Sequence, residues 1–99
     1  MLAHVQNDLF AVGADLSCPI VDEAEYPPLR FEPDYIDRLE GRCALYNEQV
    51  PKLRSFILRG GTPAAAAVHI ACTVTRRAER STWAAIQEHC DSMNVLTAK

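Results

Sequence analysis

Charged residues at helical spacing follow directly behind an apolar, alanine-rich stretch of this sequence. In TVTRRAER, residues 73–80, Arg76 lies three residues before Glu79 and four before Arg80, so all three can reach one patch of a helix. Guanidinium groups match phosphate oxygens in bidentate fashion, and a nearby carboxylate can order an arginine or lie near a metal ion. The pattern indicates either a phosphate-binding patch or a solvated, salt-bridged helix face, and spacing alone favours the second. Arg77 points about 100° away from Arg76 and fits the surface or an interface.

The segment before this patch offers two further candidates. Gly60 and Gly61 permit a tight turn with positive φ just ahead of a helix start, where free amide groups and the helix dipole attract anions. Most such turns only redirect the chain, so GGTP by itself is a weak phosphate signal. Phe56, taken alone, is typical of a core aromatic residue. The sequence has no Ser/His/Asp arrangement, paired-carboxylate motif or Walker loop, and therefore no hydrolase signature.

Length and composition limit the remaining possibilities. For 99 residues we expect a single domain, residues 1–99, and the 48% hydrophobic and 23% charged content argues against disorder. A net charge of -3 disfavours a nucleic-acid binder, and the uncharged stretch 60–75 is too short to span a membrane. Four cysteines without a CxxC pair and three histidines without zinc-like spacing indicate packed, reduced thiols and no metal site. These features predict a soluble, cytoplasmic protein.

The elements that must position these residues begin with a helix from about Leu2 to Leu16, because apolar residues recur there at steps of three and four. No capping residue precedes this helix, so we expect its start to be truncated. Segment 17–33 contains four of the six prolines and an acidic cluster. Since proline disfavours helix, we predict a surface loop across one end of a bundle rather than a binding loop. The apolar face of the first helix is expected to contain Leu2, Val5, Leu9, Val12 and Leu16.

Two more helices are predicted. One follows Pro33 and continues to about Val50, and the other starts at Thr62 and Pro63, a cap followed by proline, and runs to about His89. Residues 90–99 are predicted to be a loop that ends without a packed element. The fold class is therefore all-α, part of an antiparallel helix bundle with one long crossover. A stripe of small residues on the last helix is expected to permit close packing: Val68, Ala71, Thr75, Ala78 and Thr82.

Three stretches, in order along the chain, resemble the PduO-type ATP:cob(I)alamin adenosyltransferases: VQNDLFAVGADLSCPI, YIDRLEGRCALYNEQVPKLRSFILRGG and HIACTVTRRAERS. Members of that family are five-helix bundles that assemble as trimers, with active sites between subunits. They transfer the 5'-deoxyadenosyl group of ATP to the cobalt of cob(I)alamin and release triphosphate. The resemblance implies a partial five-helix bundle, a homotrimer, ATP and the corrinoid cobalamin as substrates, and Mg²⁺ as a cofactor.

The resemblance also implies roles for individual residues. Phe56, in the family's FILPGG-like segment, is expected to pack beneath the corrin, where it displaces the lower axial ligand, excludes water and favours four-coordinate cobalt. Arg76 matches an arginine that contacts ATP phosphates. Glu79 and Arg80 match charged residues that complete the phosphate-binding side of the site, near a magnesium ion. The implied catalytic residues are Phe56, Arg76 and Glu79. The implied ATP-binding residues are Arg76, Glu79 and Arg80, and Phe56 is the cobalamin-binding residue.

The chain departs from the family's pattern at several points. Nothing matches the TGDDGTT-like loop that wraps ATP, and the chain stops before an NRLSD-like helix, so we expect a domain without the N-terminal ATP loop and the C-terminal helix. Cys72 stands where the family has an arginine that contacts the neighbouring subunit, Arg59 replaces a proline and Ala11 an aspartate. A neutral thiol cannot replace a guanidinium group. Two alternatives stay open: a catalytically inactive helical module that associates or binds corrinoid, and an unrelated helical interaction domain.

Overall fold

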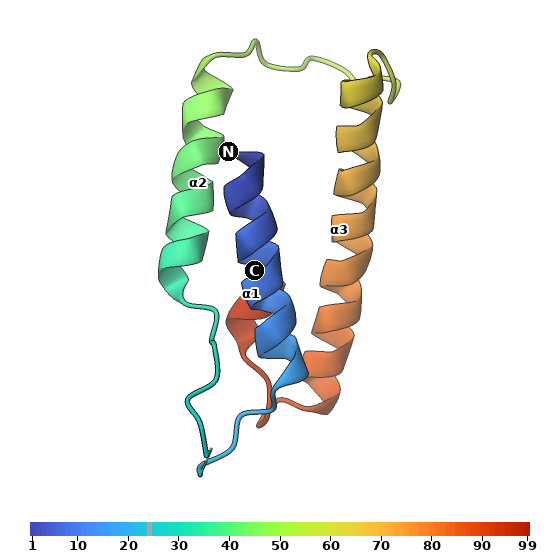
Figure 1. Ribbon diagram of the computed structural model, residues 1–99. Helices are drawn as coiled ribbons and strands as arrows, with labels where there is room; N and C mark the ends of the chain where they lie inside the picture. Colours follow the sequence, from blue (N-terminus) through green and yellow to red (C-terminus); the bar gives the residue numbers. More distant parts are fainter. Residues whose placement is uncertain (24) are drawn as a thin grey trace.

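Three long helices and one short 3-10 helix make up the computed structural model, which describes residues 1–23 and 25–99. Helix α1 spans Leu2–Ser17, α2 spans Pro33–Glu48, α3 spans Pro63–Glu88, and the 3-10 helix η1 spans Val95–Ala98. Successive long helices run in opposite directions (Figure 1). No strand occurs in the described residues, and the prediction of an all-α antiparallel bundle is confirmed. Ala24, inside the predicted loop, lies outside the described residues.

The sequence signals at the helix ends act as predicted. Helix α1 ends at an extended Cys18, with φ of -118°, because the following Pro19 disfavours helical backbone before it. Helix α3 begins at Thr62, whose Oγ1 accepts a hydrogen bond from the amide of Ala65 at 3.2 Å. Gly61 has a φ of 101°, a left-handed conformation that favours glycine and turns the chain into α3.

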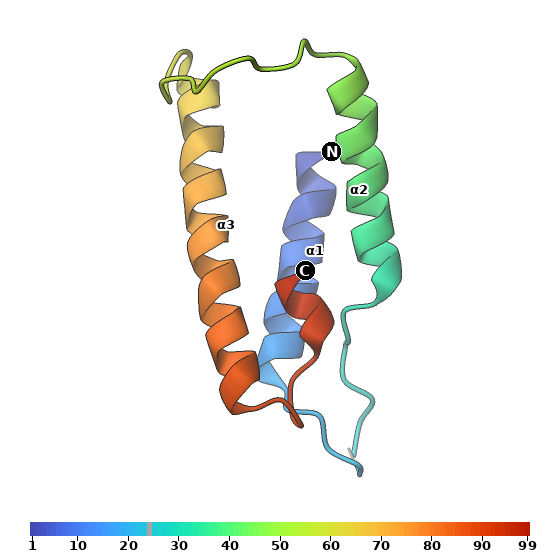
Figure 2. The same ribbon diagram turned by 180° about the vertical axis from the view of Figure 1, so that it is seen from behind.

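The predicted packing faces of α1 and α3 are wrong. Leu2 and Leu9 are 68% and 57% exposed, whereas Ala11 and Asp15 are the buried residues of α1. On α3, four members of the small-residue stripe are exposed and only Thr82 is half-buried. The physical reason is that η1 packs against both α1 and α3, so burial falls on the positions near η1 (Figure 2).

The end of the chain also differs from the prediction of an unpacked loop. Asn94 caps η1, because its side-chain oxygen accepts a hydrogen bond from the amide of Leu96 at 3.1 Å. Thr97 Oγ1 donates to the carbonyl of Asn94 at 2.7 Å, and Ala98 is buried. Residues 95–98 therefore form a packed element, which short-range hydrogen bonding by asparagine and threonine explains.

A buried carboxylate joins three distant parts of the chain. The Asp15 side chain is fully buried, and its Oδ1 accepts a hydrogen bond from Arg30 Nη1 at 2.6 Å. Its Oδ2 accepts from the backbone amide of Phe31 and from Asn94 Nδ2, both at 2.7 Å. A buried charge is stable only when it is paired and hydrogen-bonded, and these three donors satisfy it. Asp15 thus connects the end of α1 to the loop before α2 and to the cap of η1.

The same contacts change the interpretation of segment 17–33. The guanidinium of Arg30 also donates to the carbonyl of Pro19 at 3.0 Å, and Asn94 donates to the carbonyl of Phe31 at 2.8 Å. The Phe31 side chain is buried, and its ring stacks on that of Tyr35 with centroids 4.6 Å apart. The prediction of a mere surface connection is therefore wrong at its end, where Arg30 and Phe31 enter the core.

Two other expectations concern the surface. All four cysteines are free and exposed, so the expectation that they are packed is wrong. In the described ranges, no helix has the length and apolar character that crossing a membrane requires.

Replacing Asp15 by asparagine should destabilise the fold strongly, because Arg30 would lose its buried counter-charge and an amide cannot accept all three hydrogen bonds. We expect a loss of about 2 to 4 kcal/mol in the free energy of unfolding, measured by urea denaturation. The matched control is Asp8→Asn, on the same helix, which breaks the more exposed Asp8–Arg38 pair of 3.1 Å. That control should lose less than about 1 kcal/mol, and equal losses for both variants would contradict this role of Asp15.

Stability should also depend on pH through Asp15. Burial alone would raise the pKa of this carboxyl, but hydrogen bonds from Phe31, Arg30 and Asn94, with the charge of Arg30, outweigh burial and lower the pKa. The unfolded state therefore binds the proton more readily than the folded state. The stabilisation is complete above the unfolded pKa of about 3.9 and is lost as pH falls through the lower folded pKa. Urea midpoints from pH 7 to pH 2 should fall more steeply for the wild type than for Asp15→Asn, and parallel curves would contradict this.

Candidate functional site

The charged residues singled out in the sequence lie on one exposed flank of α3. Arg76 Nη1 donates to Glu79 Oε2 at 2.7 Å, and the two side chains are 72% and 36% exposed. The expected convergence of Arg76 and Glu79 is confirmed. Among the described residues, the side chains of Arg77 and Arg80 form no hydrogen bond or ion pair.

An open groove runs beside this ion pair, with a volume of about 480 Å³. Its lining changes along α3 from apolar side chains to the Arg76–Glu79 pair, and Lys99 adds a second cation. Such a surface can hold a ligand that is apolar at one end and anionic at the other. The lining residues are Val68, Ala71, Cys72, Thr75, Arg76, Glu79 and Lys99.

Lys99 is a groove residue that the sequence prediction missed. It reaches the groove because Asn94 is bonded to Asp15 and η1 packs against α3. A contact between residues 79 positions apart has no local sequence signal. The available sequence signal is Asp15 itself, since an aspartate near the end of an apolar helix needs a partner when it is buried.

Phe56 lies apart from this groove. It belongs to the segment between α2 and α3, and its side chain is fully exposed, as is nearly all of Leu58. Phe56 does not line the groove, whose first residue on α3 is Val68. The interpretation of Phe56 as a core aromatic is therefore wrong. Phe56, Ile57 and Leu58 together form a run of exposed apolar side chains, and contiguous exposed apolar surface is typical of a binding surface.

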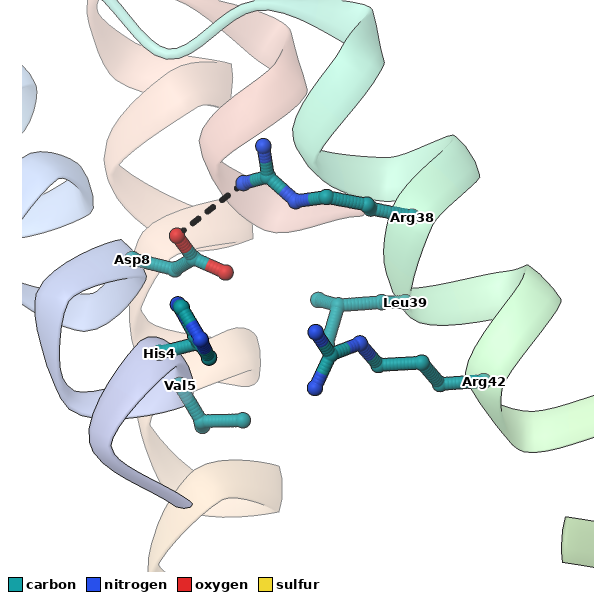
Figure 3. Close-up of a pocket in the computed structure, with 6 residues that line it drawn as sticks. All are labelled: His4, Val5, Asp8, Arg38, Leu39 and Arg42. Carbon is teal, nitrogen blue, oxygen red and sulfur yellow. Dashed lines mark hydrogen bonds and ion pairs between the residues drawn. The ribbon is translucent and has the colours of Figure 1, made fainter. Parts of the chain in front are cut away.

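A second, smaller hollow lies between α1 and α2 (Figure 3). Arg38 Nη2 donates to Asp8 Oδ1 at 3.1 Å, and its guanidinium lies 4.8 Å from the ring centre of Tyr35. Arg42 points toward His4 across the hollow (Figure 3). The volume of about 10 Å³ holds at most one water molecule, so this hollow is a polar contact between helices and no substrate site.

Metal ligation has little support in the described part of the chain. No three side chains of histidine, cysteine, aspartate or glutamate come together there. Glu79 is a single carboxylate, and it is already paired with Arg76. Magnesium, however, often needs only one or two protein carboxylates when substrate phosphates supply the other oxygens.

Comparison with known proteins identifies one family over nearly the whole chain. The family model for cobalamin adenosyltransferase matches residues 1–98. The corrinoid adenosyltransferase of Mycobacterium tuberculosis is 56% identical over 99 residues, covering 100% of this chain and 51% of that protein. The Mycobacterium leprae corrinoid adenosyltransferase is 51% identical over 102 residues, with 100% and 53% covered. The corrinoid adenosyltransferase PduO of Citrobacter freundii is 38% identical over 81 residues, with 81% and 24% covered.

The chain spans about half the length of the curated mycobacterial relatives that it matches. The match nevertheless extends over almost every residue of this chain, including α1, α2, α3 and the segment that carries Phe56. The resemblance noted in the sequence is confirmed, and this chain belongs to the cobalamin adenosyltransferase family.

Proposed function

We propose that this protein transfers the 5'-deoxyadenosyl group of ATP to the cobalt of cob(I)alamin and releases triphosphate. The observation that carries the proposal is the Arg76–Glu79 pair at the edge of an open groove, in a chain whose family match spans residues 1–98. In this reaction the Co(I) electron pair forms the new bond to C5', and the C5'–O bond breaks. The leaving triphosphate gains charge as that bond breaks.

The α3 flank would hold the triphosphate. Arg76 and Arg80 lie one turn apart, and their guanidinium groups can donate paired hydrogen bonds to phosphate oxygens. Glu79 restrains Arg76 through the 2.7 Å contact, so less side-chain freedom is lost when phosphate binds. The cations would then stabilise the charge that develops on the leaving group.

Phe56 would act on the corrinoid. Its exposed ring, with Ile57 and Leu58 beside it, offers an apolar surface of the kind that lies against a corrin face and excludes water. A ring beneath the cobalt removes the lower axial ligand and favours the Co(I) nucleophile. The cobalt supplies the bond-forming chemistry, and the protein supplies orientation and a dry surface.

The assembled enzyme is proposed to be a cytoplasmic homotrimer in which residues 1–99 act as one helical domain. The exposed apolar residues of α1 and of the segment around Phe56 support an association of this kind, because isolated domains seldom expose so much apolar surface. Mg²⁺ would enter with the ATP phosphates, and Glu79 is the side-chain carboxylate that lines the groove among the described residues.

A second candidate is a helical module that binds corrinoid without turnover. Cys72, a neutral and exposed thiol in the groove, favours it, because this position adds no cation to the triphosphate wall. Incubating the protein with ATP and cob(I)alamin separates the two. Adenosylcobalamin and triphosphate in equal amounts support the transferase, whereas corrinoid binding without either product supports the inactive module.

Changing Arg76 to alanine should weaken ATP use, because a charged contact to triphosphate and the restraint from Glu79 are both lost. A hydrogen bond between charged groups contributes about 2 kcal/mol, so kcat/KM for ATP should fall roughly 30-fold in the adenosylation assay. Arg77→Ala is the matched control, since it removes an adjacent arginine that forms no ion pair. Similar losses of kcat/KM in Arg76→Ala and Arg77→Ala would contradict a specific contact between Arg76 and the triphosphate.

Changing Phe56 to alanine should impair the corrinoid half of the reaction only. We expect adenosylation from cob(II)alamin and a reductant to fall at least about tenfold, since the exposed ring that covers the cobalt is removed. ATP affinity, measured by calorimetry, should stay within about twofold. Leu53→Ala, which removes another exposed apolar residue of the same segment, serves as the control. An equal loss of ATP affinity and adenosylation in Phe56→Ala would refute the division of roles.

A further inference from the structure

Arg59 lies in the turn before α3, and its side chain contacts that helix. Arg59 directly precedes Gly60 and Gly61, where the backbone turns through the left-handed conformation of Gly61. The loop consequently lies beside the first turns of α3 (Figures 1 and 2). Arg59 Nη1 donates to Thr73 Oγ1 at 3.3 Å, fourteen residues further along the chain.

The acceptor on α3 is itself oriented. Thr73 Oγ1 donates its proton to the carbonyl of His69 at 3.0 Å, so its lone pairs are left for Arg59. One Arg59 nitrogen is held by this contact, while the remaining guanidinium N–H groups form no hydrogen bond within the described residues. Arg59 therefore keeps most of its donor capacity for a ligand.

The helical register brings Arg59 to the same flank as the proposed triphosphate residues. At 100° per residue, Thr73 lies about 60° from Arg76 and about 20° from Arg80 around α3, and the three positions cover about 10 Å of its length. The groove residues Cys72, Thr75 and Glu79 lie on the other side of Arg76. Arg76 thus stands at the boundary between the groove and a row of cations.

Positive charge is in excess along this row of cations. The row contains Arg59, Arg76 and Arg80, and Glu79 is the one carboxylate that is paired with any of them in the described residues. The excess of two positive charges, spread over about 10 Å, fits a linear polyanion better than a single phosphate group. A chain of three phosphates can meet all three guanidinium groups at once.

We propose that Arg59 is a further phosphate-binding residue, which with Arg76 and Arg80 makes the α3 flank selective for a triphosphate chain over shorter phosphates. The inference rests on the proposed function, in which triphosphate is the leaving group, and it adds a residue to which no role had been given. Arg59 binds the end of the chain nearest the glycine turn, and Thr73 positions its guanidinium.

The test is calorimetric titration of the protein with inorganic tripolyphosphate, pyrophosphate and phosphate at low ionic strength. The wild type should bind tripolyphosphate most tightly, and Arg59→Gln should weaken that binding by about fivefold while changing phosphate binding by less than about twofold. The matched control is Arg54→Gln, which removes the same charge from the same exposed segment and should change tripolyphosphate binding by less than about twofold. Thr73→Val, which removes only the anchor, should give a smaller loss than Arg59→Gln.

Equal effects of Arg59→Gln and Arg54→Gln would overturn the proposal, since bulk charge would then explain both. No preference of the wild type for tripolyphosphate would overturn it as well. The adenosylation assay on the same variants separates this inference from the proposed function. If the wild type transfers the adenosyl group and Arg59→Gln binds tripolyphosphate as tightly as the wild type, only the role of Arg59 is refuted. If Arg59→Gln selectively loses tripolyphosphate binding but the wild type transfers no adenosyl group, only the proposed transferase is refuted.

Discussion

The buried carboxylate of Asp15 is the interaction on which the arrangement of the chain depends. Few large side chains are buried in the described residues: the buried apolar residues are Ala11, Phe31, Ile86 and Ala98, and the buried acid is Asp15. Apolar burial alone is therefore small, and the three hydrogen bonds to Asp15 supply the specificity that a larger core would otherwise provide. They hold the end of α1 against the loop that leads into α2 and against the cap of η1.

The contacts of Asp15 also help to shape the candidate groove. Asn94, held by Asp15, caps η1, and η1 packs on α3 so that Lys99 lines the groove together with Arg76 and Glu79. The opposite end of α3 is set by different forces, namely the threonine cap and the left-handed Gly61. Contacts of η1 thus place Lys99 at the groove, and the turn at Gly61 places Phe56 and Arg59 beside the start of α3.

Sequence reasoning predicted what depends on local chemistry. The ends of α1 and α3 follow from Pro19, Thr62 and Pro63, and the Arg76–Glu79 pair follows from its spacing on α3. It failed where distant contacts decide the outcome, because neither the burial of Ala11 and Asp15 nor the packing of η1 has a periodic signal. The apolar residues of α1 were expected inside, and most of them are exposed. The contact of Arg59 with Thr73, across fourteen residues, likewise has no local sequence signal.

Phe56 and the α3 flank are proposed to hold the two substrates of one reaction. Electron paramagnetic resonance of cob(II)alamin bound to the protein with ATP tests this most directly, because the spectrum reports whether cobalt keeps a lower axial ligand. The predicted result is a four-coordinate spectrum that appears only when ATP is also bound. A five-coordinate spectrum that ATP leaves unchanged would contradict it.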